Sequence, residues 1–302
     1  MAKLSLRAYQ REIERLIDRG QTDEAILHCR HILQQTPKHL NTYRLLGKAY
    51  LENQRYGDAA DILQRVLSAV PDDFVSHAGM SIIREDENNM DAAIWHMERA
   101  FEVQPYNAAI REELSRLYGR RDGLEPPKIF NTRGSLARMY AKCNLYAQAI
   151  AELRAALGED SQRPDLQVLL ARMYAQSGQR VEAVETCNGL LNKLPNCLEA
   201  NQILTEILPG TERAAEAQTY RQRLIALDPY LAYLSPAAPT SDQVPENAVV
   251  IEYFDTRQEQ VAPRPEVRPS WATSLGIEVG ELTPSEAALP EWLSTTAAPL
   301  AL

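Results

Sequence analysis

The sequence has few of the features that support disulfide bonding, secretion or membrane insertion. Only four of its 302 residues are cysteine, and no two of them form a C-x-x-C pair, which argues against a disulfide framework. No stretch approaches the ~20 apolar residues of a membrane span. The charged N-terminal segment has no apolar core followed by a cleavage site, so it does not resemble a signal peptide. We therefore expect a cytoplasmic protein that does not enter a membrane.

Basic side chains are also in the minority. The chain has 32 lysines and arginines against 41 acidic residues, a formal net charge of −9. Residues 235–302 alone hold ten acidic side chains and three basic ones. A field of this sign repels phosphate backbones and anionic lipid surfaces. We therefore expect neither a nucleic-acid partner nor a membrane partner.

Common catalytic and nucleotide-binding signatures are missing too. The sequence has no Walker A loop and no G-x-G-x-x-G, G-x-S-x-G or H-E-x-x-H motif. His28 and His31 are three residues apart and could contact one metal ion, but no further ligand accompanies them. We expect no catalytic residue, no cofactor and no metal ion, so that the protein is not an enzyme. The alternative is an enzyme whose site forms at a groove that the sequence does not reveal.

What the sequence does contain is an internal repeat of 34 residues. Alanines mark it in two groups with this spacing, and a step of 56 residues separates the groups. Proline follows most of these alanines by twelve residues, while a large and a small residue commonly precede them by nine and twelve. The alanines are Ala25, Ala59, Ala93, Ala149, Ala183 and Ala217, and the prolines are Pro37, Pro71, Pro105, Pro195 and Pro229.

Each class of position has a mechanical role in a pair of packed helices. Two helices that cross closely need a small side chain on each at the contact, as Gly47 with Ala59 or Ala137 with Ala149 would provide. A bulky neighbour such as Tyr50 fills the groove beside that contact. Proline ends the second helix because it cannot continue it. The pattern therefore predicts a series of helix-turn-helix units.

This spacing resembles the tetratricopeptide repeat of bacterial proteins. The resemblance implies an all-α fold, a right-handed superhelical α-solenoid of helix-turn-helix repeats that binds other proteins. Full repeats are expected over residues 6–39, 40–73, 74–107, 130–163, 164–197 and 198–231.

Residues 108–129 begin a further repeat but do not complete it. Asp122-Gly123 and Pro126-Pro127 stand where its second helix would lie, and they would break that helix. We expect a half-repeat at which the solenoid changes direction. The predicted organisation is an N-terminal block (1–107), a connector (108–129), a C-terminal block (130–234) and a tail (235–302).

The tail differs in composition from the rest, because half of the 18 prolines fall within it. We expect it to be acidic and mostly irregular. Its apolar stretches permit two interpretations. They have no individual role in a disordered tail, or they are docking segments, with residues 248–254 covering the end of the last repeat. The candidate docking residues are Val250, Phe254, Trp271 and Trp292.

The first helices of the repeats also carry a stripe of basic residues, one position after the small residue. In the tetratricopeptide arrays that this sequence resembles, the residue at this position tends to face the concave groove. One interpretation is a site for acidic peptides, from a partner or from the chain's own tail. The other is a solvated face whose arginines pair with nearby glutamates. The candidate groove residues are Lys48, Arg116, Arg138 and Arg172 of the stripe, together with Arg44 and Asn131, which flank it.

These features favour a non-enzymatic adaptor or scaffold that binds a peptide or helix of a partner protein in its concave groove. The alternative is a permanent structural or regulatory subunit of a larger complex. The sequence names neither the partner nor the process, because repeat proteins of one fold serve many functions.

Overall fold

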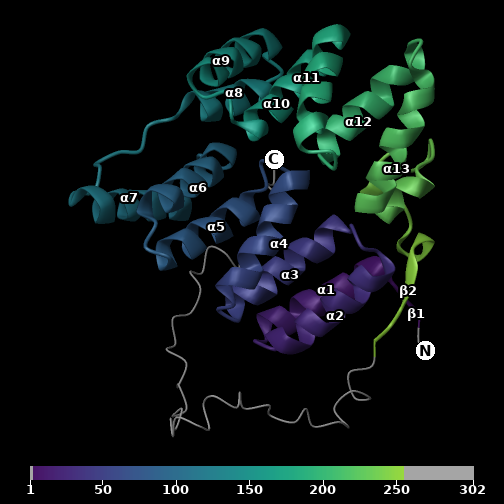
Figure 1. Cartoon of the computed structure of the whole chain (residues 1–302), viewed down its shortest axis with the longest axis horizontal. Helices are drawn as coiled ribbons and strands as arrows, with labels where there is room; N and C mark the ends of the chain where they lie inside the picture. The colour runs from purple at the N-terminus through teal and green to yellow at the C-terminus, as the bar shows by residue number, and fades with distance from the viewer. Residues whose placement is uncertain (1–2, 255–302) are drawn as a thin grey trace, which may run out of the picture.

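A computed structural model describes residues 3–254, and helices make up most of that part of the chain (Figure 1). A helix without a partner, α7 (Ala108–Asp122), divides the array. The paired helices on either side are α1 (Leu6–Asp18) with α2 (Thr22–Gln35), α3 (Leu40–Glu52) with α4 (Tyr56–Ala69), α5 (Phe74–Asp86) with α6 (Met90–Val103), α8 (Arg133–Lys142) with α9 (Tyr146–Glu159), α10 (Pro164–Gln176) with α11 (Arg180–Lys193), and α12 (Leu198–Ile207) with α13 (Ala217–Leu227).

Short elements complete the described chain. They are the 3-10 helices η1 (Leu208–Gly210), η2 (Ala214–Glu216), η3 (Pro229–Tyr233), η4 (Ser241–Gln243) and η5 (Glu246–Ala248), and the strands β1 (Lys3–Ser5) and β2 (Val250–Glu252). The predicted all-α solenoid of helix pairs is confirmed, with each pair inside one of the expected repeats.

The marker residues occupy the helix crossings, as their size predicts. Ala25, Ala59 and Ala93 have no exposed surface in the structure. A Cβ atom added to Gly47 would stand 2.7 Å from a methyl group of Leu63 on the partner helix. The crossing is therefore too close for any larger residue at position 47 unless Leu63 moves.

In five of the six helix pairs, the turn between the two helices has one residue with a left-handed backbone. The residues with positive φ in these turns recur every 34 positions within each block, and two of them are glycines. Glycine and asparagine tolerate this conformation better than other residues, whereas glutamine adopts it at a cost of about 1–2 kcal/mol. The five residues are Gly20, Gln54, Asn88, Asn144 and Gly178.

The unpaired helix α7 marks the change of direction. Gly123, with φ of 79°, ends α7, and the chain then runs back along it without a second helix. Glu125 lies against Gly119, and Ser115 donates a hydrogen bond to the carbonyl of Pro126. Helix α8 then packs against α6, which α7 also contacts. From here on, the N-terminal block means helices α1–α7, so that it includes the helix of the predicted connector, and the C-terminal block means helices α8–α13.

A buried group of charges joins the two blocks. Glu102 at the end of α6 is 1% exposed, and its carboxylate accepts a 2.5 Å hydrogen bond from Arg163 before α10. Arg163 also binds Asp165 at 2.7 and 2.9 Å, and Thr132 donates to Glu102 at 2.8 Å. Burial alone would raise the pKa of Asp165, but the guanidinium groups of Arg163 and Arg138 hold it below its usual range.

The close approach at this junction also explains a glycine. A Cβ atom on Gly134, in the first turn of α8, would overlap the Glu102 carboxylate. Any side chain there would force the Glu102 carboxylate to shift from its position against Arg163. The sequence of α8 is thus matched to the position of one carboxylate in the other block.

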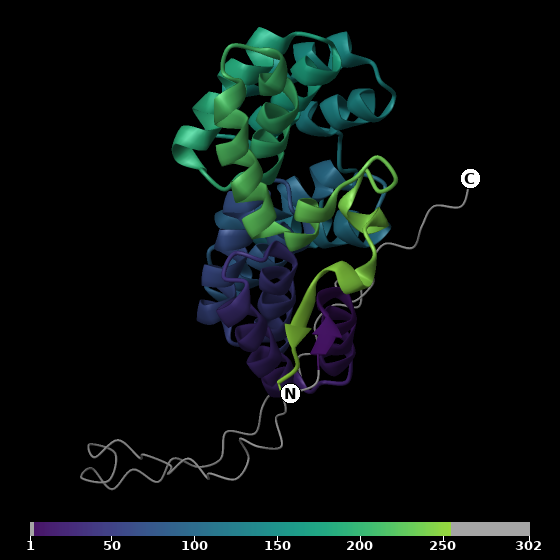
Figure 2. The same ribbon diagram turned by 90° about the vertical axis from the view of Figure 1, so that its right-hand side faces the viewer.

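Residues 229–254, which we call the strap, return from α13 to the N-terminus (Figure 2). Strand β2 pairs antiparallel with β1, with Leu4 opposite Ile251. The expectation that residues 248–254 cover the end of the last repeat is wrong, because they lie on the first repeat. The expected irregular tail therefore contains a packed segment from 235 to 254, and residues 255–302 lie outside the described part of the chain.

Helix α13 forms a second contact between the C-terminal block and the N-terminal block. Its Leu227 is buried in a small apolar cluster with Leu40, Val66 and Ala69 of α3 and α4. The two blocks thus touch at the Glu102–Arg163 junction and again at this cluster. The array is a closed ring of helices within the described residues (Figure 1).

The junction predicts the effect of removing one of its charges. We expect Arg163→Ala to lower the free energy of unfolding by about 3–5 kcal/mol, because it leaves Glu102 and Asp165 buried without their main partner. Arg133→Ala is the matched control: Arg133 also pairs with two carboxylates, but it is 48% exposed, so the loss should stay below about 1 kcal/mol. Urea unfolding followed by circular dichroism measures both. Equal losses would show that the junction does not hold the blocks together.

A second prediction concerns the helix crossings. A Cβ atom on Gly79 would lie 2.7 Å from Leu51 and 2.9 Å from Leu63, so Gly79→Ala should destabilise the protein by about 1 kcal/mol despite the better helix propensity of alanine. Gly189 in α11 has nothing within 4 Å of such an atom. Gly189→Ala should therefore stabilise by about 0.5–1 kcal/mol. Thermal unfolding of the two variants should shift in opposite directions, and a shift in the same direction would contradict this account.

Candidate functional site

The space between the two blocks forms three adjoining hollows, which together we call the interblock cleft. The strap hollow, of about 710 Å³, lies between α1, α3, α12, α13 and the strap. The middle hollow, of about 480 Å³, lies between α3, the α4–α5 turn, α10 and α12. The connector hollow, of about 560 Å³, lies between that turn, α8 and α10. Neighbouring hollows share lining residues, so the cleft runs along the concave side of the C-terminal block.

The turn between α4 and α5 enters the cleft from the N-terminal block. Asp72, in this turn, lines both the middle and the connector hollow. Its carboxylate accepts a 2.9 Å hydrogen bond from Arg138 on α8. The next residue, Asp73, caps the N-terminus of α5 through the amide of Ser76 and pairs with Arg44 at 2.6 Å. A Val-Pro-Asp-Asp turn of the chain therefore occupies part of the concave face.

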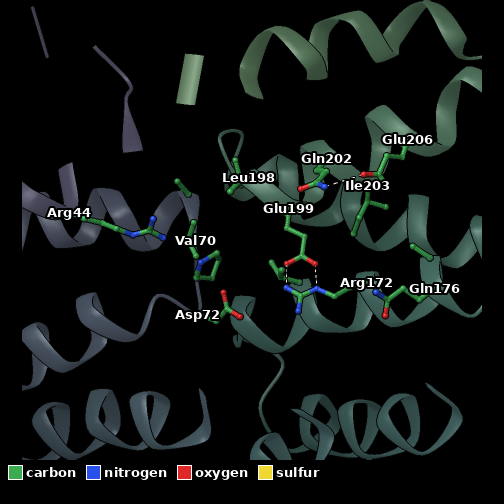
Figure 3. Close-up of a pocket in the computed structure, with 14 residues that line it drawn as sticks. Arg44, Val70, Asp72, Arg172, Gln176, Leu198, Glu199, Gln202, Ile203 and Glu206 are labelled. Carbon is green, nitrogen blue, oxygen red and sulfur yellow. Dashed lines mark hydrogen bonds and ion pairs between the residues drawn. The ribbon is translucent and has the colours of Figure 1, made fainter. Parts of the chain in front are cut away.

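Across the middle hollow, Arg172 on α10 and Glu199 on α12 form a bidentate ion pair (Figure 3). Burial raises the pKa of Glu199 even though Arg172 pairs with it, and the nearby charge of Asp72 acts in the same direction. The hydrogen bond with Glu199 in turn raises the pKa of Arg172. The pair is positioned to hold α10 and α12 at a fixed spacing.

The connector hollow has a different balance of charge. Arg138, Lys142 and Arg172 contribute three cations to its lining, whereas Asp72 contributes the carboxylate. Lys142, the last residue of α8, is exposed. The two arginines pair with Asp72, Asp165 and Glu199, so Lys142 is the cation of this hollow that has no ion-pair partner among residues 3–254.

The structure brings together three of the predicted groove residues and leaves the others elsewhere. Arg44, Arg138 and Arg172 line the cleft. Lys48 lies outside the cleft, where its ammonium group is 3.1 Å from the carboxylate of Asp18. Arg116 on α7 lies outside the cleft, and Asn131 is exposed in the connector.

The basic groove candidates all have carboxylate partners of their own. Arg116, for example, binds Glu85 and Glu113, each at 2.6 Å. Arg138 is 9% exposed and lies between Asp72 and Asp165. A ligand that used these arginines would have to share or displace an internal carboxylate.

Sequence reasoning missed the acidic side of the cleft. Asp72 follows Pro71, a marker of the repeat, and nothing in the spacing sets it apart from other polar turn residues. Its role depends on a contact with Arg138, 66 residues later in the chain. Lys142 was missed for a similar reason, because it lies near Asp72 only when the blocks face each other.

Two of the four candidate docking residues of the tail, Val250 and Phe254, lie on the first repeat. The ring of Phe254 stacks on His31 with ring centroids 5.2 Å apart, and its amide donates to Tyr9 at 3.2 Å. Val250 is 47% exposed on the outer side of β2. Trp271 and Trp292 lie outside the described residues.

The histidines considered as metal ligands serve other contacts. His28 is hydrogen-bonded to Tyr9 at 2.7 Å, and His31 contacts the carbonyl of Glu252 at 3.0 Å. Among residues 3–254, no group of three or more suitable side chains is arranged around a metal position. Within the same range, every helix is too short or too polar to cross a lipid bilayer.

Comparison with known proteins agrees with this geometry. Residues 16–81 and 144–207 match the sequence model of the tetratricopeptide repeat. A stretch of 94 residues is 28% identical to subunit 7 of the anaphase-promoting complex of Arabidopsis thaliana. This match covers 31% of the chain and only 17% of that subunit.

Solved structures of repeat proteins are similar at low identity. The crystal structure of MamA is 18% identical, with a TM-score of 0.34 over 59% of this chain and 92% of that one. A thermophilic repeat protein of Thermus thermophilus, TTC0263, is 17% identical, with a TM-score of 0.34 over 67% of this chain and 98% of that one.

The two sequence matches fall in different blocks, and each overlaps helix pairs that carry the 34-residue pattern. The turn geometry, the buried alanines and the helix order follow the same period on both sides of α7. On these grounds the chain carries tetratricopeptide repeats on both sides of α7.

Proposed function

We propose that the protein is a non-enzymatic scaffold that binds an acidic peptide segment of a partner protein in the interblock cleft. The observation that carries this proposal is the position of Asp72. A carboxylate of the chain itself is held by Arg138 on the concave side of the C-terminal block, between two hollows that remain open. The surface therefore already accommodates an acidic turn.

The charge balance favours the connector hollow as the place where such a segment enters. Lys142 has no ion-pair partner among the described residues there, so an incoming acidic side chain gains an attraction that no internal carboxylate already satisfies. The middle hollow does not offer the same gain, because its three carboxylates, Asp72, Glu199 and Glu206, outnumber its two arginines. Lys142 is the most accessible of the three cations and would make the first contact.

Binding of this kind needs no chemistry from the protein. The cleft supplies arginines for charge-assisted hydrogen bonds and apolar walls from residues such as Leu169 and Met173. Its histidine, His39, is buried, and burial lowers its pKa to about 4. A histidine with such a pKa is a poor proton acceptor near neutral pH, which supports a role in packing.

A second candidate function is that of a permanent subunit of a larger complex. Large apolar side chains are exposed near the connector, where Tyr106, Leu124 and Phe130 are each more than 70% exposed. Tyr106 follows Glu102 by four residues and Phe130 precedes Thr132 by two, and Glu102 and Thr132 are hydrogen-bonded. The similarity of part of the chain to a subunit of a multi-protein complex agrees with this candidate.

Peptide binding with charge-changed variants tests the proposed cleft. The probe is a fluorescein-labelled peptide with the sequence of residues 68–77, SAVPDDFVSH, and fluorescence anisotropy measures its affinity. Asp72→Asn should tighten binding by about tenfold, because the internal carboxylate no longer competes for Arg138. Lys142→Glu should weaken binding by about five- to tenfold, since a cation at the entrance becomes a carboxylate.

Two controls separate the cleft from general electrostatics. Lys128→Glu makes the same charge change on the exposed connector outside the cleft, and it should leave the affinity unchanged. The peptide SAVPNNFVSH should bind no variant. If Asp72→Asn remains folded by circular dichroism and still does not bind the acidic peptide, the cleft is not a site for acidic segments.

A further inference from the structure

The strap completes a hollow at one end of the interblock cleft. Residues 234 and 239–242 of the strap form one wall of the strap hollow, and Gln202 and Glu206 on α12 form part of another. Helices α1 and α3 line it on the side of the N-terminal block. The strap reaches this place by running from α13 back to the N-terminus (Figure 2). The hollow therefore depends on the strap and on the closure of the ring, and no single repeat provides it.

The wall that the strap provides is fixed from both sides. Arg7 on α1 donates to the carbonyls of Ser241 at 2.5 Å and Val244 at 2.8 Å, and its guanidinium lies 3.8 Å from the ring centre of Tyr230. Ala238 and Val244, which precede and follow the residues of the wall, are 7% and 2% exposed in the apolar core of the N-terminal block. The wall is therefore preformed, and a ligand does not have to order it.

The rest of the strap is also firmly anchored. Val249 and Ile251 are buried in the same apolar core. The ring of Tyr253 packs against Tyr9 with ring centroids 5.0 Å apart, and the amide of Phe254 donates to the Tyr9 hydroxyl. The strap hollow is thus a built part of the folded chain.

Apolar side chains line the hollow without filling it. Leu234 in the strap is 39% exposed, and Leu198 on α12 and Leu231 in the strap are partly exposed. The volume of about 710 Å³ lies inside the range of about 300–1,000 Å³ that is usual for ligand pockets. Burial of a large apolar side chain is the main gain that the hollow offers, because its three arginines and three carboxylates balance. The charged residues are Arg7, Arg44, Arg221, Glu206, Asp228 and Asp242.

The hollow is continuous with the site proposed for acidic segments. It shares Leu198 and Gln202 with the middle hollow, which shares Asp72 and Arg172 with the connector hollow. Helices α8, α10 and α12 are neighbours, so two steps of about 8–10 Å separate α8 from α12. Lys142 ends α8 and Leu198 begins α12. An extended segment of about seven residues covers this diagonal, since each residue spans about 3.3 Å.

We propose that the strap hollow is an anchor pocket for a large apolar side chain, best supplied by tryptophan, on the same partner segment whose carboxylate contacts Lys142 about seven residues away. The inference rests on the proposed function, because it adds a second contact to the ligand of the cleft. Charge complementarity at Lys142 and the apolar wall at the other end require both features in one segment. An indole buries about 150–250 Å² and presents an N–H group that a wall carboxylate can accept.

Two extended versions of the acidic probe test the pocket, since a segment can run along the cleft in either direction. SAVPDDFVSHGSW and WGSSAVPDDFVSH each place tryptophan about seven residues from the nearest aspartate. Fluorescence anisotropy with the full chain should show one of them binding at least about tenfold more tightly than the same peptide with serine in place of tryptophan. Leu234→Asp should abolish this gain, because it puts a charge in the apolar wall. Gln202→Trp, which fills the hollow from α12, should abolish it too.

A matched control lies on the residue before Leu234. Tyr233→Asp adds the same charge at a side chain that is 53% exposed and does not line the hollow, so the gain from tryptophan should persist. Circular dichroism checks that each variant remains folded. A gain that survives in both Leu234→Asp and Gln202→Trp would overturn the pocket.

The peptides also separate the pocket from the acidic site. Binding of SAVPDDFVSH with no gain from tryptophan would refute the pocket and leave the proposed function supported. Failure of SAVPDDFVSH, with binding of SAVPNNFVSHGSW that Leu234→Asp abolishes, would refute the acidic site and support the pocket alone. A gain that appears only after Trp271→Ala and Trp292→Ala would assign the hollow to the chain's own tail and would overturn the choice of a partner segment.

Discussion

The arrangement of this molecule depends on one buried contact, the hydrogen-bonded ion pair between Glu102 and Arg163. A carboxylate with 1% exposure is strongly unfavourable unless a cation meets it, so the end of α6 and the start of α10 cannot separate without a large cost. Gly134 lets α8 approach closely enough for the pair to form. This contact sets the angle between the blocks, and the angle determines which residues face each other across the cleft.

Once the blocks are held in this way, three further contacts between them can form. The α4–α5 turn faces the concave side of the C-terminal block, where Arg138 binds Asp72. Helix α13 reaches α3 and α4, where Leu227 enters their apolar cluster. The strap then has a short path back to α1. An open solenoid with the same repeats would expose each of these surfaces to water.

Much of the fold could be predicted from the sequence, because the repeat is a local property. The spacing of Ala25, Ala59 and Ala93 and the helix breakers after Asp122 depend on contacts between residues less than a repeat apart, which a period reveals. The left-handed turn positions also follow the period, although Gln54 shows that residue type alone would have missed one of them. Six helix pairs and the unpaired α7 therefore lie where the pattern indicates.

The site was only partly predictable, since it depends on contacts across the ring. Arg138 and Arg172 face the groove as the helix position suggests, but their carboxylate partners come from unrelated points of the lattice. The pairing of β1 with β2 joins residues separated by nearly the whole described chain. Neither period nor composition carries information about such pairs, which is why the contact of the strap with the first repeat could not be predicted.

Because Asp72 already occupies Arg138, the affinity of this cleft for a partner segment depends on how easily Asp72 is released. If the proposed function holds, a partner segment competes with Asp72 for Arg138, and its apparent association constant is the intrinsic one multiplied by the fraction of molecules in which the arginine is released. Weak acidic sequences, which are abundant in any cell, are excluded by this competition. A segment that also contacts Lys142 and the apolar wall would make more contacts than the single Asp72–Arg138 contact that it breaks. Self-occupancy thus raises the threshold for binding without adding a contact against any particular competitor, which is a form of specificity that a bare arginine groove would lack.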